Sequence, residues 1–264
     1  MRTFYPRLLM AAAIALFVTS APLHASDTDD RIETAAKKSY VFKTYLKDDS
    51  IHVNSKDGVV TLTGTVDQES HQTLAQETVA GLPGVKRVDN QLKVKGERPA
   101  KDSDGWLATK VKSALLFHKN VSAVKTEVDA KNGLVTLRGE AESEAQKDLT
   151  AEYTKEVEGV KGVKNLMTVA KSGAKRDEPR RDESVGQNID DASITAQVKM
   201  ALLSHRSTSA GDTKVETNDG VVTLSGRARN TAEKDLTTKL VDDINGVKKV
   251  VNNMTVDEKI SKRN

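Results

Sequence analysis

Histidine would be the natural starting point for catalytic or metal chemistry, because the chain contains no cysteine. Beyond the N-terminal region the histidines are His52, His71, His118 and His205. His118 and His205 stand at matching places in two related segments, near the end of a predicted helix, and Lys43 takes that place in a third segment. One histidine per segment supplies neither a metal-ligand set nor a catalytic triad. We therefore interpret these three residues as groups that cap helix carbonyls or favour the helix dipole.

Pairs of acidic residues could serve carboxylate catalysis or calcium binding. The pairs are Asp48-Asp49, Asp190-Asp191 and Asp242-Asp243. They lack the alternating spacing of oxygen ligands in a calcium loop, so we expect solvated surface at all three. The sequence also contains no glycine-rich phosphate-binding motif. These observations predict a protein that is not an enzyme, with no catalytic residue, no metal and no cofactor.

The single tryptophan belongs to a pattern that a binding site would use. Trp106 lies eleven residues before Phe117 on a predicted helix, so both fall on nearly the same face, together with Lys110. This face is about 100° away from the apolar stripe of the same helix. Aromatic residues beside a lysine, away from the core stripe, are typical of an interfacial membrane contact. The alternative is that Trp106 packs over the edge of the core or in a groove between segments.

One phrase that occurs three times indicates the elements that must position these residues. It reads DGVVTLTG at 57–64, NGLVTLRG at 132–139 and DGVVTLSG at 219–226. Its opening Asp-Gly or Asn-Gly predicts a β-hairpin turn, because both residues tolerate positive φ angles. Its last glycine lies inside the second strand, which indicates a bulge or a close approach by another backbone or helix. We expect a structural role for all six glycines, which are Gly58, Gly133 and Gly220 in the turns and Gly64, Gly139 and Gly226 in the strands.

Each copy of the phrase is predicted to lie in a small α+β domain of the order αββαβ. In the second copy, apolar residues recur at helical spacing over 104–118, two β-prone runs follow, and a second helix and a final strand complete the unit. We expect two helices to cover one face of a three-stranded mixed sheet, with polar residues on the other face. The predicted domains are 30–95, 104–170 and 190–257, with a charged linker at 171–189.

The first 25 residues have the three parts of a secretory signal peptide. Arg2 and Arg7 precede an apolar run at 8–18, which is shorter than the roughly 20 residues of a membrane-spanning helix. We expect cleavage between Ala25 and Ser26 and export to the periplasm, with neither a lipid anchor nor a transmembrane helix in the mature chain. Without the two arginines, 39 basic residues face 38 acidic ones. This balance predicts no general attraction to nucleic acid.

The segments DASITAQVKMALL, DGVVTLSG and GVKKVVNN together resemble the BON domain of OsmY-like periplasmic proteins. The resemblance covers nearly the whole mature chain, in three copies. It implies an αββαβ fold, an envelope or periplasmic location, a role in osmotic and envelope stress, and binding to phospholipid or to partner proteins. It brings no catalytic residues. The familiar relatives carry two copies, so the third copy departs from their pattern.

We therefore expect a non-enzymatic envelope protein that binds phospholipid membrane surfaces peripherally. Trp106, Lys110 and Phe117 of the second copy are the predicted membrane contact. The alternative function is that of a periplasmic chaperone or protein–protein adaptor, whose exposed sheet faces would hold envelope or client proteins. The sequence carries no prediction of the oligomeric state.

Overall fold

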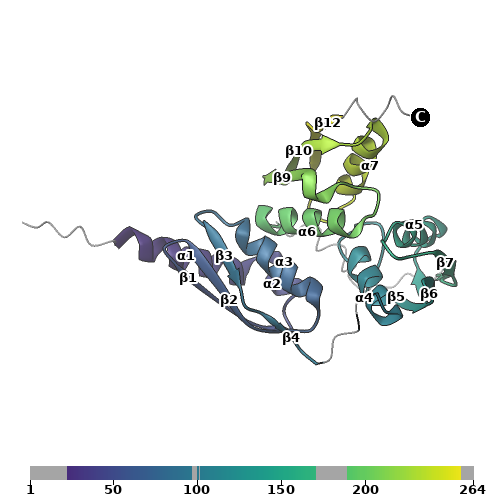
Figure 1. The fold of residues 1–264 in the computed structure, drawn as a ribbon, viewed down its shortest axis with the longest axis horizontal. Coiled ribbons are helices and arrows are strands. Elements are labelled where there is room, and N and C mark those ends of the chain that lie inside the picture. Colours follow the sequence, from purple (N-terminus) through teal and green to yellow (C-terminus); the bar gives the residue numbers. More distant parts are fainter. Residues whose placement is uncertain (1–22, 97–99, 101, 171–188, 257–264) are drawn as a thin grey trace, which may run out of the picture.

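Three α+β domains follow one another in the computed structural model, which describes residues 23–96, 100, 102–170 and 189–256. Figure 1 shows them as domain 1 (α1 to β4), domain 2 (α4 to β8) and domain 3 (α6 to β12). The predicted linker lies outside the described residues except for Ile189. Most of the predicted signal peptide also lies outside them, but helix α1 begins at Leu23, so the predicted cleavage site lies near the start of that helix.

The three domains repeat the same order of elements, except that domain 1 has a second short helix, and domain 3 a 3₁₀ turn, before the first strand. Domain 1 contains α1 Leu23–Lys38, α2 Tyr40–Thr44, β1 Ser50–Lys56, β2 Val59–Val66, α3 Glu69–Ala80, β3 Arg87–Asn90 and β4 Lys93–Val94. Domain 2 contains α4 Asp104–Leu115, β5 Thr126–Lys131, β6 Leu134–Ala141, α5 Glu144–Lys155, β7 Gly162–Asn165 and β8 Thr168–Val169. Domain 3 contains α6 Asp191–Ser204, a 3₁₀ turn Ala210–Asp212, β9 Thr213–Asn218, β10 Val221–Ala228, α7 Thr231–Asp242, β11 Lys249–Asn252 and β12 Thr255–Val256.

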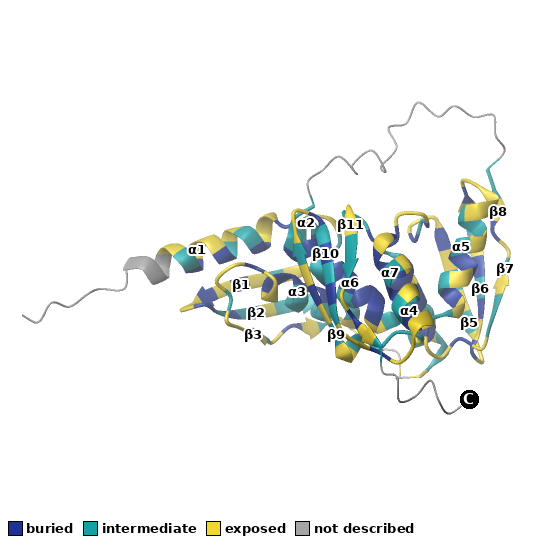
Figure 2. Cartoon of the chain, turned by 90° about the horizontal axis from the view of Figure 1, so that it is seen from above, coloured by how far each residue is buried: buried dark blue, intermediate teal, exposed yellow. Residues whose placement is uncertain are grey.

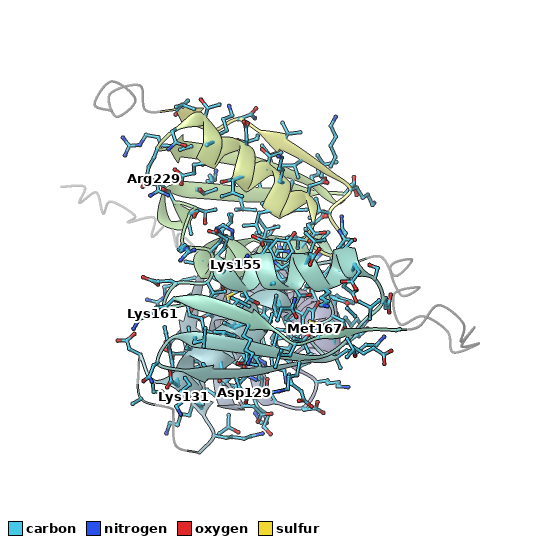
Figure 3. The ribbon with its side chains drawn as sticks, turned by 90° about the vertical axis from the view of Figure 1, so that its right-hand side faces the viewer. Asp129, Lys131, Lys155, Lys161, Met167 and Arg229 are labelled. Atoms are coloured by element: carbon cyan, nitrogen blue, oxygen red, sulfur yellow. The ribbon has the colours of Figure 1, made fainter. Side chains whose placement is uncertain are left out.

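The second strand is the centre of each sheet. In domain 1, β2 pairs antiparallel with β1 and parallel with both β3 and β4, which follow each other along one edge. The same pairing holds in domains 2 and 3, so the predicted three-stranded mixed sheet is confirmed. Side chains alternate across these strands, as a pleated strand requires. Figure 3 shows Asp129 and Lys131 of β5 at the strand layer of domain 2; both are exposed.

The repeated phrase forms the predicted hairpins. Asp57, Asn132 and Asp219 have φ angles of 54°, 53° and 50°, and each is followed by a glycine that also has positive φ. Two successive residues of positive φ are what a type I′ turn requires. The second glycine of the phrase is a close approach rather than a bulge, because each copy pairs one-to-one with a residue of the first strand and no extra residue is inserted up to that pair. A Cβ on Gly139 would lie 2.0 Å from the Lys125 carbonyl oxygen.

An aspartate of the first helix holds each hairpin turn in place. In domain 2 the Asp104 carboxylate accepts hydrogen bonds from the backbone N–H groups of Asn132 and Gly133, at 2.9 and 3.2 Å. Asp29 and Asp191 do the same for the turns of domains 1 and 3. In domains 2 and 3 this aspartate is the first residue of the helix, so the hairpin tip and the helix start lie together at one end of the domain. In domain 1 the helix begins earlier, at Leu23, and the hairpin tip lies beside its middle.

Domain 3 lies between the other two domains, as Figure 2 shows. Its helix α6 contacts α3 of domain 1 and α4 of domain 2 as well as its own sheet. This explains why α6 is apolar nearly all round, with nine buried residues. The buried apolar residues agree with this arrangement of the domains, because those of domains 1 and 3 form one continuous cluster.

Domain 1 contacts α6 from its N-cap Asp190 to Lys199. The Asp190 carboxylate accepts a hydrogen bond from the Tyr40 backbone N–H at 2.8 Å, and the Ser193 hydroxyl accepts one from the Val41 backbone N–H at 3.1 Å. Further along the helix, Lys199 Nζ lies 2.7 Å from Glu77 Oε2 of α3. These contacts are mixed apolar and polar, and they fix domain 1 against one end of α6.

Domains 2 and 3 meet through reciprocal contacts of matching residues. His118 forms an isolated antiparallel bridge with Ile244, and His205 forms the matching bridge with Val157. The backbone N–H of Lys119 donates to the Asp243 carbonyl at 2.8 Å, and that of Arg206 donates to the Glu156 carbonyl at 2.9 Å. Each contact therefore occurs twice with the two domains exchanged, which is the pattern of an isologous two-fold interface built within one chain.

Candidate functional site

The polar clusters of the described residues have structural roles. The nearest approach to a catalytic pair is His71, whose Nδ1 lies 2.7 Å from Asp49 Oδ2. The other oxygen of Asp49 accepts a hydrogen bond from the Asp67 backbone N–H, so this carboxylate ties together the segments on either side of the β1–β2 hairpin. Within the described ranges, no group of three or more His, Asp or Glu side chains could hold a metal ion.

The two matching histidines, His118 and His205, lie near the ends of their helices, as predicted, and His205 is the C-cap residue of α6. Both are buried in the interface between domains 2 and 3, which the prediction did not include. Burial lowers the pKa of His205 below its usual value, although the nearby Glu156 opposes this effect, so the neutral imidazole is favoured. His118 stacks on the Tyr153 ring at a centroid distance of 3.9 Å. The helix periodicity located these residues but could not show the second domain that covers them.

The prediction of solvated acidic pairs is wrong for most of their members. Asp49 pairs with His71, while Asp190 and Asp191 cap a helix and a hairpin. Asp243 is only 9% exposed and accepts a hydrogen bond from the Tyr153 hydroxyl at 2.6 Å. Each of these carboxylates is buried or bonded by a segment distant in sequence, which no local pattern reveals.

Trp106 lies in the first turn of α4, at the hairpin end of domain 2. Its backbone N–H is capped by the Ser103 hydroxyl at 3.2 Å. The ring is half-buried and packs against the apolar core of domain 2. Lys110 Nζ lies 4.8 Å from the ring centroid, a cation–π distance. The same Nζ lies 3.0 Å from Glu158 Oε2, so the lysine charge is largely balanced.

Phe117 does not share this surface, which corrects the prediction. It is 2% exposed and packs edge-to-face against Tyr45 of domain 1, with ring centroids 5.3 Å apart. The physical reason is that α4 ends at Leu115, so the helical angle that relates Trp106 to Phe117 no longer applies beyond that residue. The chain leaves the helix and carries Phe117 into the junction of the three domains.

The structure places further residues at the same end of domain 2 as Trp106, which helical spacing could not identify. Asp104 holds the hairpin tip against the start of α4, which brings Lys131, Leu134 and Lys161 to the same end of the domain. Leu134 is 49% exposed, and both lysines are exposed. We call Trp106, Lys110, Lys131, Leu134 and Lys161 the tip of domain 2; Figure 3 labels Lys131 and Lys161.

The matching helix positions differ between the domains in a way that explains the exposure of Trp106. Ser193 takes this position in domain 3, is fully buried, and contacts domain 1. Arg31 takes it in domain 1, and its Nε donates to the Asp27 carbonyl. The surface that domain 3 uses to bind a neighbouring domain is therefore left open on domain 2, with a tryptophan in its place.

No helix of the described ranges is long and apolar enough to cross a membrane.

The aspartates that clamp the hairpins are a feature that the sequence could have revealed, because Asp29, Asp104 and Asp191 each stand at the same distance before a repeated turn.

Comparisons with known proteins agree with this architecture. The family model described as the BON domain matches residues 28–96, 103–171 and 190–258. "Osmotically-inducible protein Y" of Escherichia coli is 32% identical over 151 residues, covering 57% of this chain and 71% of that protein. "21 kDa hemolysin" of Actinobacillus pleuropneumoniae is 34% identical, covering 43% of this chain and 59% of that protein. "Outer membrane lipoprotein DolP" of Haemophilus influenzae is 30% identical, covering 50% of this chain and 68% of that protein.

Proposed function

Because the chain belongs to the BON domain family, we propose that it is a non-enzymatic protein of the bacterial envelope that binds phospholipid membrane surfaces reversibly. The names of its relatives support an envelope and osmotic-stress role, since one is an osmotically inducible protein and another an outer membrane lipoprotein. The predicted signal peptide supports a periplasmic location. The polar clusters described above hold domains and turns together, which favours binding over catalysis.

The observation that carries the proposal is the composition of the tip of domain 2. It presents a half-buried tryptophan, an exposed leucine and two exposed lysines at one end of a domain. Tryptophan is enriched at membrane interfaces because its ring is apolar and its N–H is polar. A lysine near an anionic membrane surface contributes about 1 kcal/mol. Lys131 and Lys161 supply this charge better than Lys110, which Glu158 balances.

The expected binding is weak for a single tip. Two lysines and one partly inserted aromatic ring give a contact that forms and dissociates readily. Stable association would require several molecules or several domains to act together on one surface.

Sedimentation with vesicles that contain anionic phospholipid tests the proposal. We expect Trp106→Ala to reduce the bound fraction severalfold and Lys131→Gln with Lys161→Gln to reduce it further, while circular dichroism stays unchanged. Leu203→Ala is the matched control, because Leu203 is an apolar side chain of domain 3 that is 57% exposed. Equal binding by the Trp106→Ala variant and the original protein would refute this site.

A second function, that of a periplasmic adaptor or chaperone, is favoured by one specific observation. The surface around Trp106 matches the surface by which domain 3 binds domain 1 through Ser193. A partner protein could dock there in the way that domain 1 docks on α6. An aggregation assay without lipid tests this function. If the original protein suppresses the aggregation of a client protein and the Trp106→Ala variant does not, the result favours this function over membrane binding.

A further inference from the structure

The surface that joins domains 2 and 3 has an open counterpart on domain 1. In domains 2 and 3 it is formed by Ala114, His118 and Val157, which face Ala201 and His205. The crevice left between these residues is only about 10 Å³. The matching residues of domain 1 are Ser39, Lys43 and Leu82, and they line a pocket of about 330 Å³ beside the start of α6.

The lining of this pocket combines an apolar base with cationic groups. Ala35 and Leu82 provide apolar surface, and Leu82 is buried. Lys38 and Lys43 contribute ammonium groups from the ends of α1 and α2, and Thr44 adds a hydroxyl. Neither lysine forms an ion pair with another described residue. The buried histidine of the closed interface, His118 or His205, is thus replaced by the exposed Lys43 in the open one.

The one carboxylate in the lining does not neutralise these lysines directly. Asp190 Oδ2 accepts hydrogen bonds from the Tyr40 backbone N–H and from the Ser193 hydroxyl, both at 2.8 Å. Asp190 Oδ1 accepts the Ser193 backbone N–H at 2.9 Å. The acidic group is therefore committed to the helix start and to the domain 1 contact, while the ammonium groups are available to a ligand.

Charge decides between two occupants of the pocket. A second copy that repeated the reciprocal pairing of domains 2 and 3 would bring Lys43 close to Lys43 of its partner, because the matching His118 and His205 lie close enough to interact. Like charges in contact are destabilising. An anion has the opposite charge and fits the space, which lies at the lower end of the range for small-molecule sites. The lining contains no arginine fork for planar carboxylates, and lysine binds phosphate as a point charge.

We propose that this pocket binds the phosphate group of a small phosphate ester, with Lys38 and Lys43 on the phosphate oxygens and the organic part against Ala35 and Leu82. The site lies in domain 1 and is separate from the tip of domain 2. It does not rest on the proposed membrane contact. The ester could be a soluble metabolite or a phospholipid headgroup, and both present the same phosphate chemistry.

NMR titration of the ¹⁵N-labelled protein distinguishes these sources. Glycerol 3-phosphate serves as the soluble probe, and vesicles of phosphatidylglycerol in phosphatidylcholine serve as the headgroup probe, with phosphatidylcholine vesicles alone as the control. We expect glycerol 3-phosphate to shift the amide resonances of residues 38–44 and Leu82, and Lys43→Gln to weaken its binding about tenfold. Lys37→Gln is the matched control, because Lys37 is an exposed neighbour outside the pocket.

Each outcome decides the proposal. Shifts confined to the pocket with the soluble ester support it, and pocket shifts with anionic vesicles alone support it with the headgroup as the source. Shifts spread evenly over the lysines of all three domains, or equal loss in Lys37→Gln and Lys43→Gln, would overturn it. A concentration-dependent dimer that protects Tyr40 and Lys43 would show that a second copy occupies the pocket instead. The Trp106→Ala variant should keep the response to glycerol 3-phosphate, which separates this test from that of membrane binding.

Discussion

Replacing Asp243 with alanine should release domain 2 from domain 3 without unfolding either domain. The Asp243 carboxylate accepts hydrogen bonds from the Tyr153 hydroxyl and the Asn120 amide, and its Oδ2 lies 3.3 Å from His118 Nδ1. All these partners belong to domain 2. Burial raises the pKa of Tyr153, so its hydroxyl stays protonated and can donate. The Asp243 side chain therefore makes most of the polar side-chain contacts in the half of the interface where α7 of domain 3 meets domain 2.

The size of the effect follows from these bonds. A hydrogen bond to a charged group contributes about 1.5–3 kcal/mol, and alanine removes two of them. Water that enters the space will satisfy part of the loss, so we expect the docking of the two domains to weaken by about 3 kcal/mol. That corresponds to a drop of about a hundredfold in the docking equilibrium.

Amide hydrogen exchange measures docking directly. The N–H groups of Lys119 and Arg206 donate across the interface, so their protection reports contact between the domains. We expect this protection to fall about a hundredfold in Asp243→Ala, while core amides such as that of Val135 keep theirs. Asp242→Ala is the matched control, because Asp242 is the exposed neighbour and only its backbone carbonyl reaches domain 2. Equal protection in the two variants would refute the role given to Asp243.

Three further predictions concern pH and the repeated turns. The docking of domains 2 and 3 should be constant above pH 6.5 and should weaken as the pH falls from there through the lowered pKa of His205. The reason is that burial disfavours the charged imidazole, which Glu156, Arg206 and His118 face. Hydrogen exchange of the Arg206 amide, measured against pH, should show this dependence in the original protein and lose it in His205→Asn. Gly139→Ala should destabilise domain 2 by about 3 kcal/mol in urea unfolding, since the new Cβ would collide with the Lys125 carbonyl at a φ of 117°, whereas Gly211→Ala, with nothing within 4 Å, should be nearly neutral. Asp104→Ala should cost about 2 kcal/mol by the same measurement, because two turn N–H groups lose their acceptor; a loss below about 0.5 kcal/mol would contradict the clamp.

The αββαβ order and the hairpins could be predicted because they depend on local signals. The turn at Asn132 and Gly133 requires positive φ at two successive residues, and few residue types accept it. The role of Gly139 could be predicted only as a choice between a bulge and a close approach. Separating the two requires the partner strand, whose Lys125 carbonyl lies beside the glycine.

The arrangement of the domains could not be predicted, because its contacts join residues far apart in the chain. Asp243 and Tyr153 are 90 residues apart, and Tyr40 and Asp190 are 150 residues apart. The same long-range packing explains why Phe117 was misplaced on the predicted membrane surface: helical spacing describes one helix and says nothing of a neighbouring domain that covers its end.

The order of the domains in space also accounts for the positions of the two candidate sites. Domain 3 lies in the middle and uses two surfaces, the start of its first helix toward domain 1 and the end of that helix toward domain 2. The counterpart of the first surface on domain 2 has no domain against it, and there Trp106 replaces the buried Ser193. The counterpart of the second surface on domain 1 closes incompletely, and there Lys43 replaces a buried histidine. Domains 1 and 2, which flank domain 3, thus each keep one pairing surface that no other domain fully covers. Trp106 and Lys43 lie on these two surfaces, at positions where the matching residues of the other domains are buried in a contact.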